Sequence, residues 1–398
     1  MRPDREDQTL FSERFRYVCG PNIACAANGD WLVTWNMSVE LEIGPYSPRR
    51  YLHPPDNPEF SNYMIRSRDQ GKTWEVPRII PSYDWRGTEH VALCVLENDE
   101  ILASFYQREF FTLEEGEKNQ SHRYGWYHRP PYPWVVTHGG TYVHRSLDHG
   151  ETWGETVKID PSPFISAYGR LRITELDSDT LIFTAGAADP MFARKDARLP
   201  YQLKNALGNR LVDGEIVQEP SRVFICISRD GGHTWNESRE IAAHPEYYFH
   251  EPAMIKLRSG RLVCHMRNCS QTGHLWQVAS DDGGETWSAP EMTPMWGWPA
   301  DLIQLDDDRV LSVYGHRKEP YGIRACISRD DGNSWDYDDE VIIRDDLIAG
   351  GIGYPVSILL DDNRVMTVYW DDQMPTITDP DANNRGTRTS IVASTYQM

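Results

Sequence analysis

The sequence has no hydrophobic run long enough to cross a membrane, since no stretch of about 18 apolar residues occurs in it. Its opening segment, MRPDREDQTLFSERF, contains no apolar core, so we expect no secretory leader. Positive charge is also scarce: 40 Lys and Arg stand against 60 Asp and Glu, for a formal net charge of −20. This balance argues against general binding of nucleic acid or of anionic membranes.

Cysteine is sparse and shows no pairing pattern. The seven cysteines are odd in number, none forms a CxxC pair, and most lie in apolar runs such as FICIS and RACIS. We therefore expect reduced, buried thiols in a cytoplasmic protein. His138, His144 and His149 lack the helical spacing of a zinc motif, and no Gly-rich phosphate loop or serine nucleophile elbow occurs. The sequence thus predicts neither a metal nor a cofactor.

One octapeptide recurs five times along the chain, and each copy follows an apolar run. The copies are SRDQGKTW (67–74), SLDHGETW (146–153), SRDGGHTW (228–235), SDDGGETW (280–287) and SRDDGNSW (328–335). The aspartate can bind backbone amides, the glycine allows a positive φ, and the tryptophan can anchor the next strand. The repeat therefore predicts a hairpin turn that builds the fold and takes no part in catalysis.

A second repeat lies between these turns, as apolar strand pairs around a short polar turn. The copies are 20–35, 89–105, 168–185, 250–267, 298–317 and 353–372. Six such hairpins predict an all-β, six-bladed β-propeller with four strands in each blade, formed by the whole chain (1–398) as one domain. We expect 389–394 to form a late strand of the last blade and a strand near 10–18 to close the ring. The insertions 37–61, 107–137 and 186–220 are expected to cover one face.

Aligning the six hairpins predicts which residues surround the central axis. The reference point is the residue before each turn, which is leucine in five copies, and the innermost strand begins six residues upstream. Those positions hold Gly20, His90, Arg170, Glu251, Pro299 and Tyr354. Four of the six carry reactive side chains where small or apolar residues would pack. The register therefore predicts a site built from His90, Arg170, Glu251 and Tyr354.

Further candidates lie at the far ends of the second strands and beside the axial positions. Arginine binds carboxylates through two parallel hydrogen bonds, so clustered arginines suggest an acidic ligand. We expect a cationic and aromatic rim that contacts substrate, formed by Arg267, Arg317, Arg324, His265, Trp298 and His250.

These repeats resemble those of the sialidase (neuraminidase) superfamily, in which the octapeptides are called Asp boxes or BNR repeats. HEPAMIKLRSGRLVCHMR and GYPVSILLDDNRVMTVYWDD resemble two of its active-site segments. The resemblance implies that Tyr354 is a nucleophile with Glu251 as its base, and that Arg267 belongs to an arginine triad with Arg317 or Arg324. It also implies an acid/base aspartate in the first insertion, for which the candidates are Asp56 and Glu59.

The chain departs from that family where an arginine opens the first blade, because Cys19 and Gly20 stand there. His90 and Arg170 are also outside the sialidase pattern. The leading hypothesis is therefore an exo-acting glycoside hydrolase for an acidic or otherwise unusual sugar. A lyase acting on a uronic acid is the alternative, with His90 or Tyr354 as base and Arg170 or Arg267 on the carboxylate. A non-catalytic carbohydrate-binding propeller is the third. In each case a carbohydrate is the expected partner.

Overall fold

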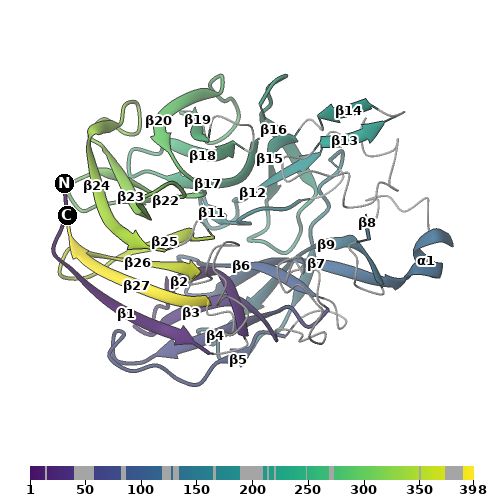
Figure 1. The fold of residues 1–398 in the computed structure, drawn as a ribbon, viewed down its shortest axis with the longest axis horizontal. Coiled ribbons are helices and arrows are strands. Elements are labelled where there is room, and N and C mark those ends of the chain that lie inside the picture. The colour runs from purple at the N-terminus through teal and green to yellow at the C-terminus, as the bar shows by residue number, and fades with distance from the viewer. Residues whose placement is uncertain are drawn as a thin grey trace, which may run out of the picture.

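Four-stranded antiparallel sheets repeat six times around a ring, as the hairpin repeat predicts (Figure 1). The chain is an all-β, six-bladed β-propeller. The structure is a computed structural model, which describes residues 1–13, 16–39, 58–81, 87–118, 127–128, 134–164, 167–188, 209–212, 215–218, 221–247, 249–268, 273–348, 351–372 and 389–398.

Each blade runs from an inner strand at the axis to an outer strand at the rim. Blade I comprises β2 (Arg16–Cys25), β3 (Trp31–Val39), β4 (Ser61–Ser67) and β5 (Arg78–Ile79); blade II comprises β6 (Thr88–Val95), β7 (Ile101–Thr112), β9 (Trp134–Ser146) and β10 (Thr156–Lys158). Blade III comprises β11 (Ile173–Glu175), β12 (Leu181–Ala188), β15 (Ser221–Ser228) and β16 (Glu237–Ala242); blade IV comprises β17 (Phe249–Lys256), β18 (Leu262–Asn268), β19 (His274–Ser280) and β20 (Glu291–Trp296). Blade V comprises β21 (Ala300–Gln304), β22 (Val310–His316), β23 (Tyr321–Ser328) and β24 (Asp336–Leu347).

Blade VI joins the two ends of the chain. Its inner strands β25 (Gly353–Leu359) and β26 (Arg364–Asp372) are followed by β27 (Thr389–Gln397), and β1 (Arg5–Ser12) pairs antiparallel with β27 as the outer strand. The closing strand lies earlier in the chain than the expected segment near 10–18, because residues from Arg16 onward already form the inner strand of blade I. Figure 1 shows the two termini side by side at this seam.

The described insertions add small elements to blades II and III. These are α1 (Leu113–Lys118), β8 (Tyr127–His128), and the hairpin of β13 (Asn209–Val212) with β14 (Glu215–Gln218). No helix in the described part of the chain has the length and apolar content needed to cross a membrane.

The five octapeptides form the same turn between the third and fourth strands of blades I to V. In blade III, Ser228 Oγ donates to Asp230 and accepts from the backbone N–H of Gly232 at 2.8 Å, while Asp230 accepts from both the backbone and the hydroxyl of Thr234. Gly232 has a φ of +91°, a conformation that glycine adopts without a steric penalty. Trp235, which follows, is 2% exposed and packs in the core.

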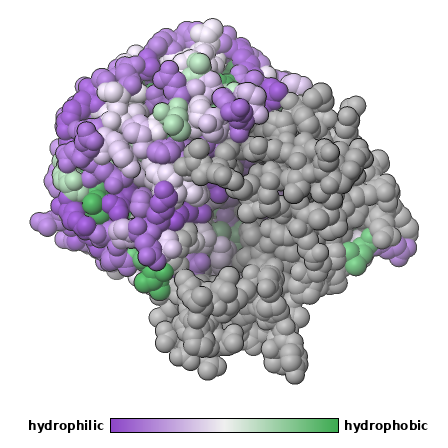
Figure 2. All heavy atoms as spheres, turned by 45° about the horizontal axis from the view of Figure 1, so that its top comes forward, coloured by the Kyte–Doolittle hydropathy of each residue, from purple (hydrophilic) through white to green (hydrophobic). Residues whose placement is uncertain are grey.

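Apolar side chains from adjacent blades meet between the sheets. One cluster joins Leu102 of blade II with Phe183 and Phe224 of blade III, and another joins Ile343 of blade V with Tyr369 of blade VI. Burying a side chain of this size contributes about 1.5–3 kcal/mol. The blades are therefore packed against one another throughout, and the described surface in Figure 2 is mostly hydrophilic with small separate apolar spots.

Candidate functional site

The inner strands of four blades carry the same irregularity where they begin. In blades I, II, IV and VI, two consecutive residues of the first strand lie opposite one residue of the second, which is a β-bulge. The first bulged residues are Gly20, His90, Glu251 and Tyr354, with φ values of +60°, +57°, +44° and +51°. The hairpin alignment therefore placed these four residues in equivalent positions.

A positive φ is costly for residues other than glycine, by about 1–3 kcal/mol each. Most other non-glycine residues with this conformation in the described chain lie in hairpin turns, such as Asp99 and Asn363. His90, Glu251 and Tyr354 instead adopt it at the starts of axial strands. Because the surrounding bulges hold these residues in place, local strain is concentrated where the three side chains meet.

Tyr354, Glu251 and Arg267 form a hydrogen-bonded chain across blades VI and IV. The Tyr354 hydroxyl donates to Glu251 Oε1, and Arg267 Nη1 donates to Glu251 Oε2 at 2.8 Å. Burial would raise the pKa of Glu251, but the charges of Arg267 and His90 and the two hydrogen bonds lower it to about 2. Burial, together with the negative charge of Glu251, raises the pKa of Tyr354 well above its ordinary value. The pair is thus an ionised carboxylate that accepts a hydrogen bond from a neutral phenol.

Three further side chains surround the Tyr354 ring. The His90 ring stacks on it with centroids 5.4 Å apart and planes inclined by 22°, and the Cζ atoms of Arg170 and Arg317 each lie 5.7 Å from its centroid. Burial lowers the pKa of both arginines, and the neighbouring positive charge of Arg267 lowers that of Arg317 further. The phenol therefore lies within a strongly cationic environment.

Both of these arginines retain buried donors without a partner among the described residues. Arg170 Nη2 donates to the carbonyl of Pro355 at 2.8 Å, but its Nη1 is buried and unpaired. Arg317 Nε and Nη2 are likewise buried and unpaired. A buried donor left unsatisfied costs about 1–3 kcal/mol, and more when it is charged. Such donors next to Tyr354 are suited to an anionic group brought by a ligand.

Blade I contributes space to the site instead of an arginine. A Cβ atom on Gly20 would lie 3.2 Å from Asn36 Oδ1 and 3.5 Å from His90 Nδ1. Asn36 is fully buried; it accepts from the backbone N–H of His90 at 2.8 Å and donates to Asn62. His90 and its asparagine support thus occupy the place into which a longer side chain at position 20 would extend.

The strand that carries Tyr354 is held by a second polar contact that sequence reasoning missed. Asp301 is fully buried, accepts from Arg172, and also accepts from the backbone N–H of Ser357 at 2.8 Å. Arg170 and Arg172 of blade III therefore act on β25 at two points, since Arg170 donates to Pro355. The two arginines in the short run RLR (170–172) were the available signal in the sequence.

Two expected substrate-binding residues do not reach the site. His265 has no exposed surface, lies between blades IV and V, and is hydrogen bonded to Ser312 and Gln277 at 2.9 Å each. Arg324 is on β23, the third strand from the axis, and forms an ion pair with Glu340 at 3.4 Å. On the second strand of a blade, only the last residues border the site. His265 lies three residues before that end and Arg324 lies on the third strand, so both side chains are packed within or between the sheets.

Other candidates lie beside the central group. Trp298 contacts two site arginines, with the Cζ atoms of Arg267 and Arg317 at 5.7 and 6.0 Å from its ring centroid. His250 points to the neighbouring blade, where its Nε2 is 3.1 Å from the Tyr168 hydroxyl. Asp56 lies outside the residues that the structure describes.

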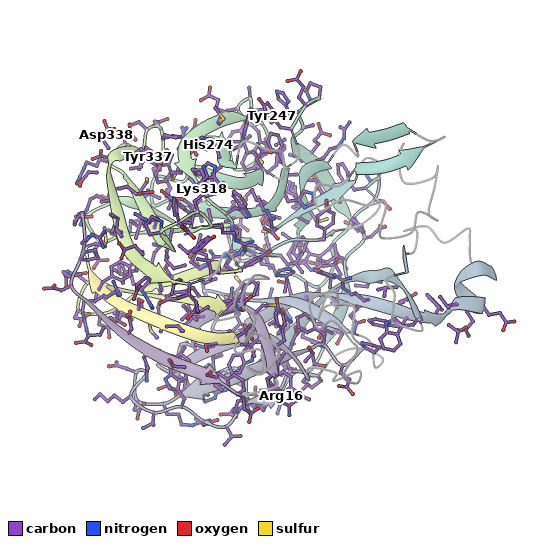
Figure 3. The ribbon with its side chains drawn as sticks, viewed as in Figure 1. Arg16, Tyr247, His274, Lys318, Tyr337 and Asp338 are labelled. Carbon is purple, nitrogen blue, oxygen red and sulfur yellow. The ribbon has the colours of Figure 1, made fainter. Side chains whose placement is uncertain are left out.

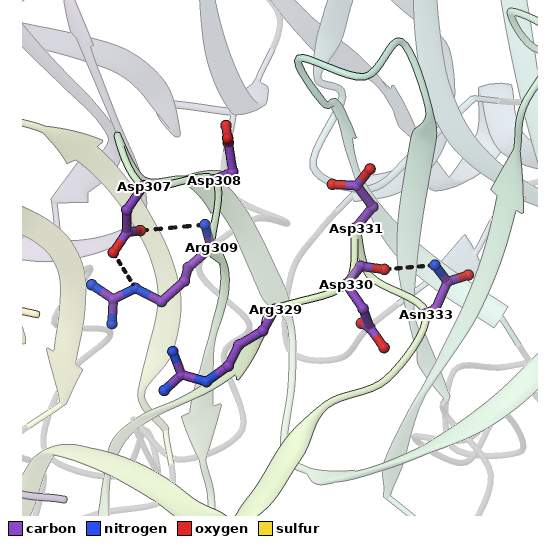
Figure 4. Close-up of a pocket in the computed structure, with 7 residues that line it drawn as sticks. All are labelled: Asp307, Asp308, Arg309, Arg329, Asp330, Asp331 and Asn333. Carbon is purple, nitrogen blue, oxygen red and sulfur yellow. Dashed lines mark hydrogen bonds and ion pairs between the residues drawn. The ribbon is translucent and has the colours of Figure 1, made fainter.

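A surface hollow of about 520 Å³ lies at the opposite end of blade V (Figure 4). The whole of β21 separates Trp298, which precedes this strand, from the turn that borders the hollow. Its charged groups are largely engaged in their own turns, as in the ion pair of Asp307 with Arg309 at 2.7 Å. Its lining residues are Asp307, Asp308, Arg309, Arg329, Asp330, Asp331 and Asn333. No cluster of His, Cys, Asp and Glu suited to a metal ion occurs in the described part of the molecule.

Comparison with known proteins places this geometry in context. The family defined by a BNR repeat-like domain matches residues 125–366. A protein of unknown function from Dyadobacter fermentans DSM 18053 is 23% identical, with a TM-score of 0.79 over 99% of this chain and 98% of that one. No curated protein sequence matches this chain.

Two solved carbohydrate-processing proteins share the architecture at lower identity. The intramolecular trans-sialidase of Ruminococcus gnavus, in complex with oseltamivir carboxylate, is 13% identical, with a TM-score of 0.57 over 96% of this chain and 94% of that one. The α-L-arabinanase of Penicillium chrysogenum, complexed with arabinobiose, is 14% identical, with a TM-score of 0.56 over 96% of this chain and 98% of that one. At these identities the structural similarities show the propeller fold.

Proposed function

Since this chain belongs to the family of proteins with a BNR repeat-like domain, we propose that its axial site is that of an exo-acting glycoside hydrolase for an acidic sugar. The observation that carries the proposal is the hydrogen bond from the Tyr354 hydroxyl to the ionised, buried carboxylate of Glu251. A tyrosine is a poor nucleophile at its ordinary pKa and needs such a base. Tyrosine nucleophiles are a recognised exception to the two-carboxylate plan of glycosidases.

The proposed reaction proceeds in two displacements. Tyr354 Oη attacks the anomeric carbon, its proton passes to Glu251, and the bond to the leaving oxygen breaks as that oxygen takes a proton from an acid. Water then attacks the same carbon as its proton passes to the conjugate base of that acid, Tyr354 departs as it recovers its proton from Glu251, and the sugar is released. Arg267 stabilises Glu251 while it is ionised. We propose Asp56 or His90 as the acid; His90 is the one in contact with Tyr354 in the structure.

The acidic character of the sugar is inferred from the arginines. Arg170 and Arg317 have buried donors next to Tyr354 that meet no partner among the residues the structure describes, and Arg267 lies beside them on Glu251. A guanidinium pairs with a carboxylate through two parallel hydrogen bonds, which a neutral hydroxyl cannot provide. A carboxylate on the bound sugar would satisfy these donors, whereas a neutral sugar would leave them charged and unpaired.

Replacing Tyr354 by phenylalanine tests the proposal, with Tyr337→Phe as the control because Tyr337 is an exposed tyrosine on β24. The substrates are 4-methylumbelliferyl glycosides of N-acetylneuraminic, glucuronic and galacturonic acids, with the glucoside and arabinofuranoside as neutral counterparts. We expect hydrolysis of an acidic glycoside only, and a loss in kcat on the order of 10³-fold or more in Tyr354→Phe. Full activity in this variant, with an unchanged melting temperature, would refute the proposal.

A uronate lyase is the second candidate, favoured by the stacking of His90 on Tyr354 and by the position of Arg170 over the same ring. Here His90 or Tyr354 would remove the proton beside the carboxylate, an arginine would stabilise the resulting negative charge, and the glycosidic oxygen would leave. This reaction forms a carbon–carbon double bond and consumes no water. New ultraviolet absorption during turnover of a polyuronate would identify it, while binding without turnover would identify a carbohydrate-binding propeller.

A further inference from the structure

Aromatic and basic side chains continue outward from the Tyr354 site along blades IV and V, and the proposed reaction does not use them. Trp296 ends β20, Trp298 precedes β21, His316 ends β22, and Lys318 lies in the connection to β23. All four lie at the same end of the blades as Arg267. Together they are called here the tryptophan shelf.

The shelf is continuous with the site. Trp298 lies beside Arg267 and Arg317, and its ring centroid is 5.0 Å from that of Trp296. The local sequence allows this packing, because Gly273, with a φ of +67°, lies beneath both indoles. A Cβ atom there would fall 2.5 Å from Trp296 Nε1 and 2.8 Å from Trp298 Cζ3. A larger residue at position 273 would therefore force the two rings apart.

Lys318 provides a cation at the outer end of the shelf. Its Nζ lies 3.6 Å from the centroid of the Trp296 ring, and His316 contacts the same ring with centroids 5.5 Å apart. Lys318 is exposed and forms no ion pair with any described residue. Figure 3 shows it near His274, the backbone partner of Trp296. Surface arginines elsewhere, such as Arg68, Arg229 and Arg258, are paired with carboxylates.

An unpaired cation held on an indole is notable in a chain with a formal net charge of −20. Indole faces stack on the apolar faces of sugar rings, and an ammonium binds carboxylate or sulfate groups. The inner end of the shelf is polar as well, because Trp298 Nε1 is buried and has no partner among the described residues. The shelf thus offers an aromatic surface with a donor and a cation, next to the sugar bound at Tyr354.

We infer that the tryptophan shelf is a second sugar subsite, which takes a unit bearing a carboxylate or sulfate linked to the sugar at Tyr354. The inference rests on the proposed function and extends it, since the substrate would be an oligosaccharide with adjacent anionic units. A single acidic sugar capping a neutral glycan would leave Lys318 without a partner.

Binding measurements on the Tyr354→Phe protein test this inference without turnover. The probes are N-acetylneuraminic acid and its α2,8-linked dimer, galacturonic acid and its α1,4-linked dimer, and lactose as a neutral dimer. We expect one acidic dimer to bind about tenfold tighter than its monomer in isothermal titration calorimetry, with a gain that falls as salt rises. Adding Lys318→Ala removes this gain and leaves monomer affinity unchanged, whereas Lys318→Arg retains it. Lys72→Ala, in a turn at the opposite end of blade I, is the control.

The outcomes separate the two proposals. If an acidic monosaccharide binds but its dimer binds no tighter, the second subsite is refuted and the acidic-sugar site stands. A dimer gain that survives Lys318→Ala also refutes the subsite. If none of the acidic probes binds, both the subsite and the proposed function are refuted.

Discussion

The two ends of the blades differ in how their polar groups are hydrogen bonded. At the turn end, the serine of each octapeptide satisfies the turn backbone: the backbone N–H of each central glycine donates to its serine hydroxyl at 2.7–2.9 Å. At the site end, strained residues gather, and charged donors of Arg170 and Arg317 remain buried without partners among the described residues. The clustering of strained residues and unpaired arginine donors around one side chain, Tyr354, indicates where a ligand is expected.

The two ends also differ in how much their sequences vary from blade to blade. The turns have nearly the same sequence in five blades because each must form the same hairpin. The bulged positions have the same backbone in four blades but carry four different side chains, Gly20, His90, Glu251 and Tyr354. A common backbone with differing side chains is the arrangement expected when the fold supplies positions and the chemistry requires distinct groups.

The largest effect should follow from removing the charge at the site end. Glu251→Gln takes away the proposed base, and we expect kcat on the acidic glycoside to fall by about 10²–10⁴-fold. The pKa of Glu251 is lowered to about 2, so this carboxylate stays ionised in the wild type down to about pH 3. A fall in wild-type kcat caused by protonation of Glu251 should therefore appear only below that pH. Glu240→Gln, which breaks an exposed pair with Arg222, is the matched control. Equal kcat values in the two variants would contradict the assignment.

A smaller effect is expected in the interior of blade IV. Burial lowers the pKa of His265 to about 4 from an ordinary value of 6.5. Below pH 6.5 the unfolded chain therefore takes up a proton that the folded chain excludes, and stability falls until the pH reaches about 4. Between pH 8 and pH 5 we expect a loss of about 2 kcal/mol in the free energy of unfolding. Urea denaturation measured at several pH values should show this loss in the wild type and not in His265→Gln, which lacks the titrating imidazole. The same pH dependence of the free energy of unfolding in both proteins would contradict the prediction.

The smallest effect is predicted at the turn end. Asp230→Asn weakens the contacts of one octapeptide with Ser228 and Thr234, and we expect a loss of about 1–2 kcal/mol in stability. The kcat should be unchanged, because the turn lies at the far end of its blade. Thermal unfolding and glycoside hydrolysis measured on the same preparation check both statements. A large fall in kcat at constant stability would mean that the two ends are not separable.

The fold could be predicted from the sequence because each blade corresponds to one copy of a sequence repeat. The same periodicity placed His90, Glu251 and Tyr354 in register, and proline follows Gly20, Glu251 and Tyr354, where the bulge needs no ladder donor. Distance along a strand was harder to judge. His265 precedes Arg267 by two residues, which is about 7 Å along the strand. His265 therefore lies away from the end of the strand that borders the site, in the interior between two blades.

Side-chain contacts between strands that are distant in the sequence could not be predicted, for a different reason. The alignment carries no information on which carboxylate meets which arginine, so Arg324 was expected in the pocket although it pairs with Glu340. For the same reason the contact of Arg172 with Asp301, which supports the Tyr354 strand, was not anticipated. Such partners are set by how neighbouring blades pack, and one sequence does not specify that packing residue by residue.

The site of covalent attachment shows most directly whether Tyr354 is the nucleophile. The protein would be treated with a glycosyl fluoride of the acidic sugar identified in the hydrolysis assay, with a second fluorine on the ring carbon next to the anomeric carbon to slow release of a glycosyl intermediate. It would then be digested and mapped by mass spectrometry. We expect time-dependent inactivation with one fluorosugar attached to Tyr354. Attachment to another residue, or inactivation of Tyr354→Phe at the wild-type rate, would contradict it.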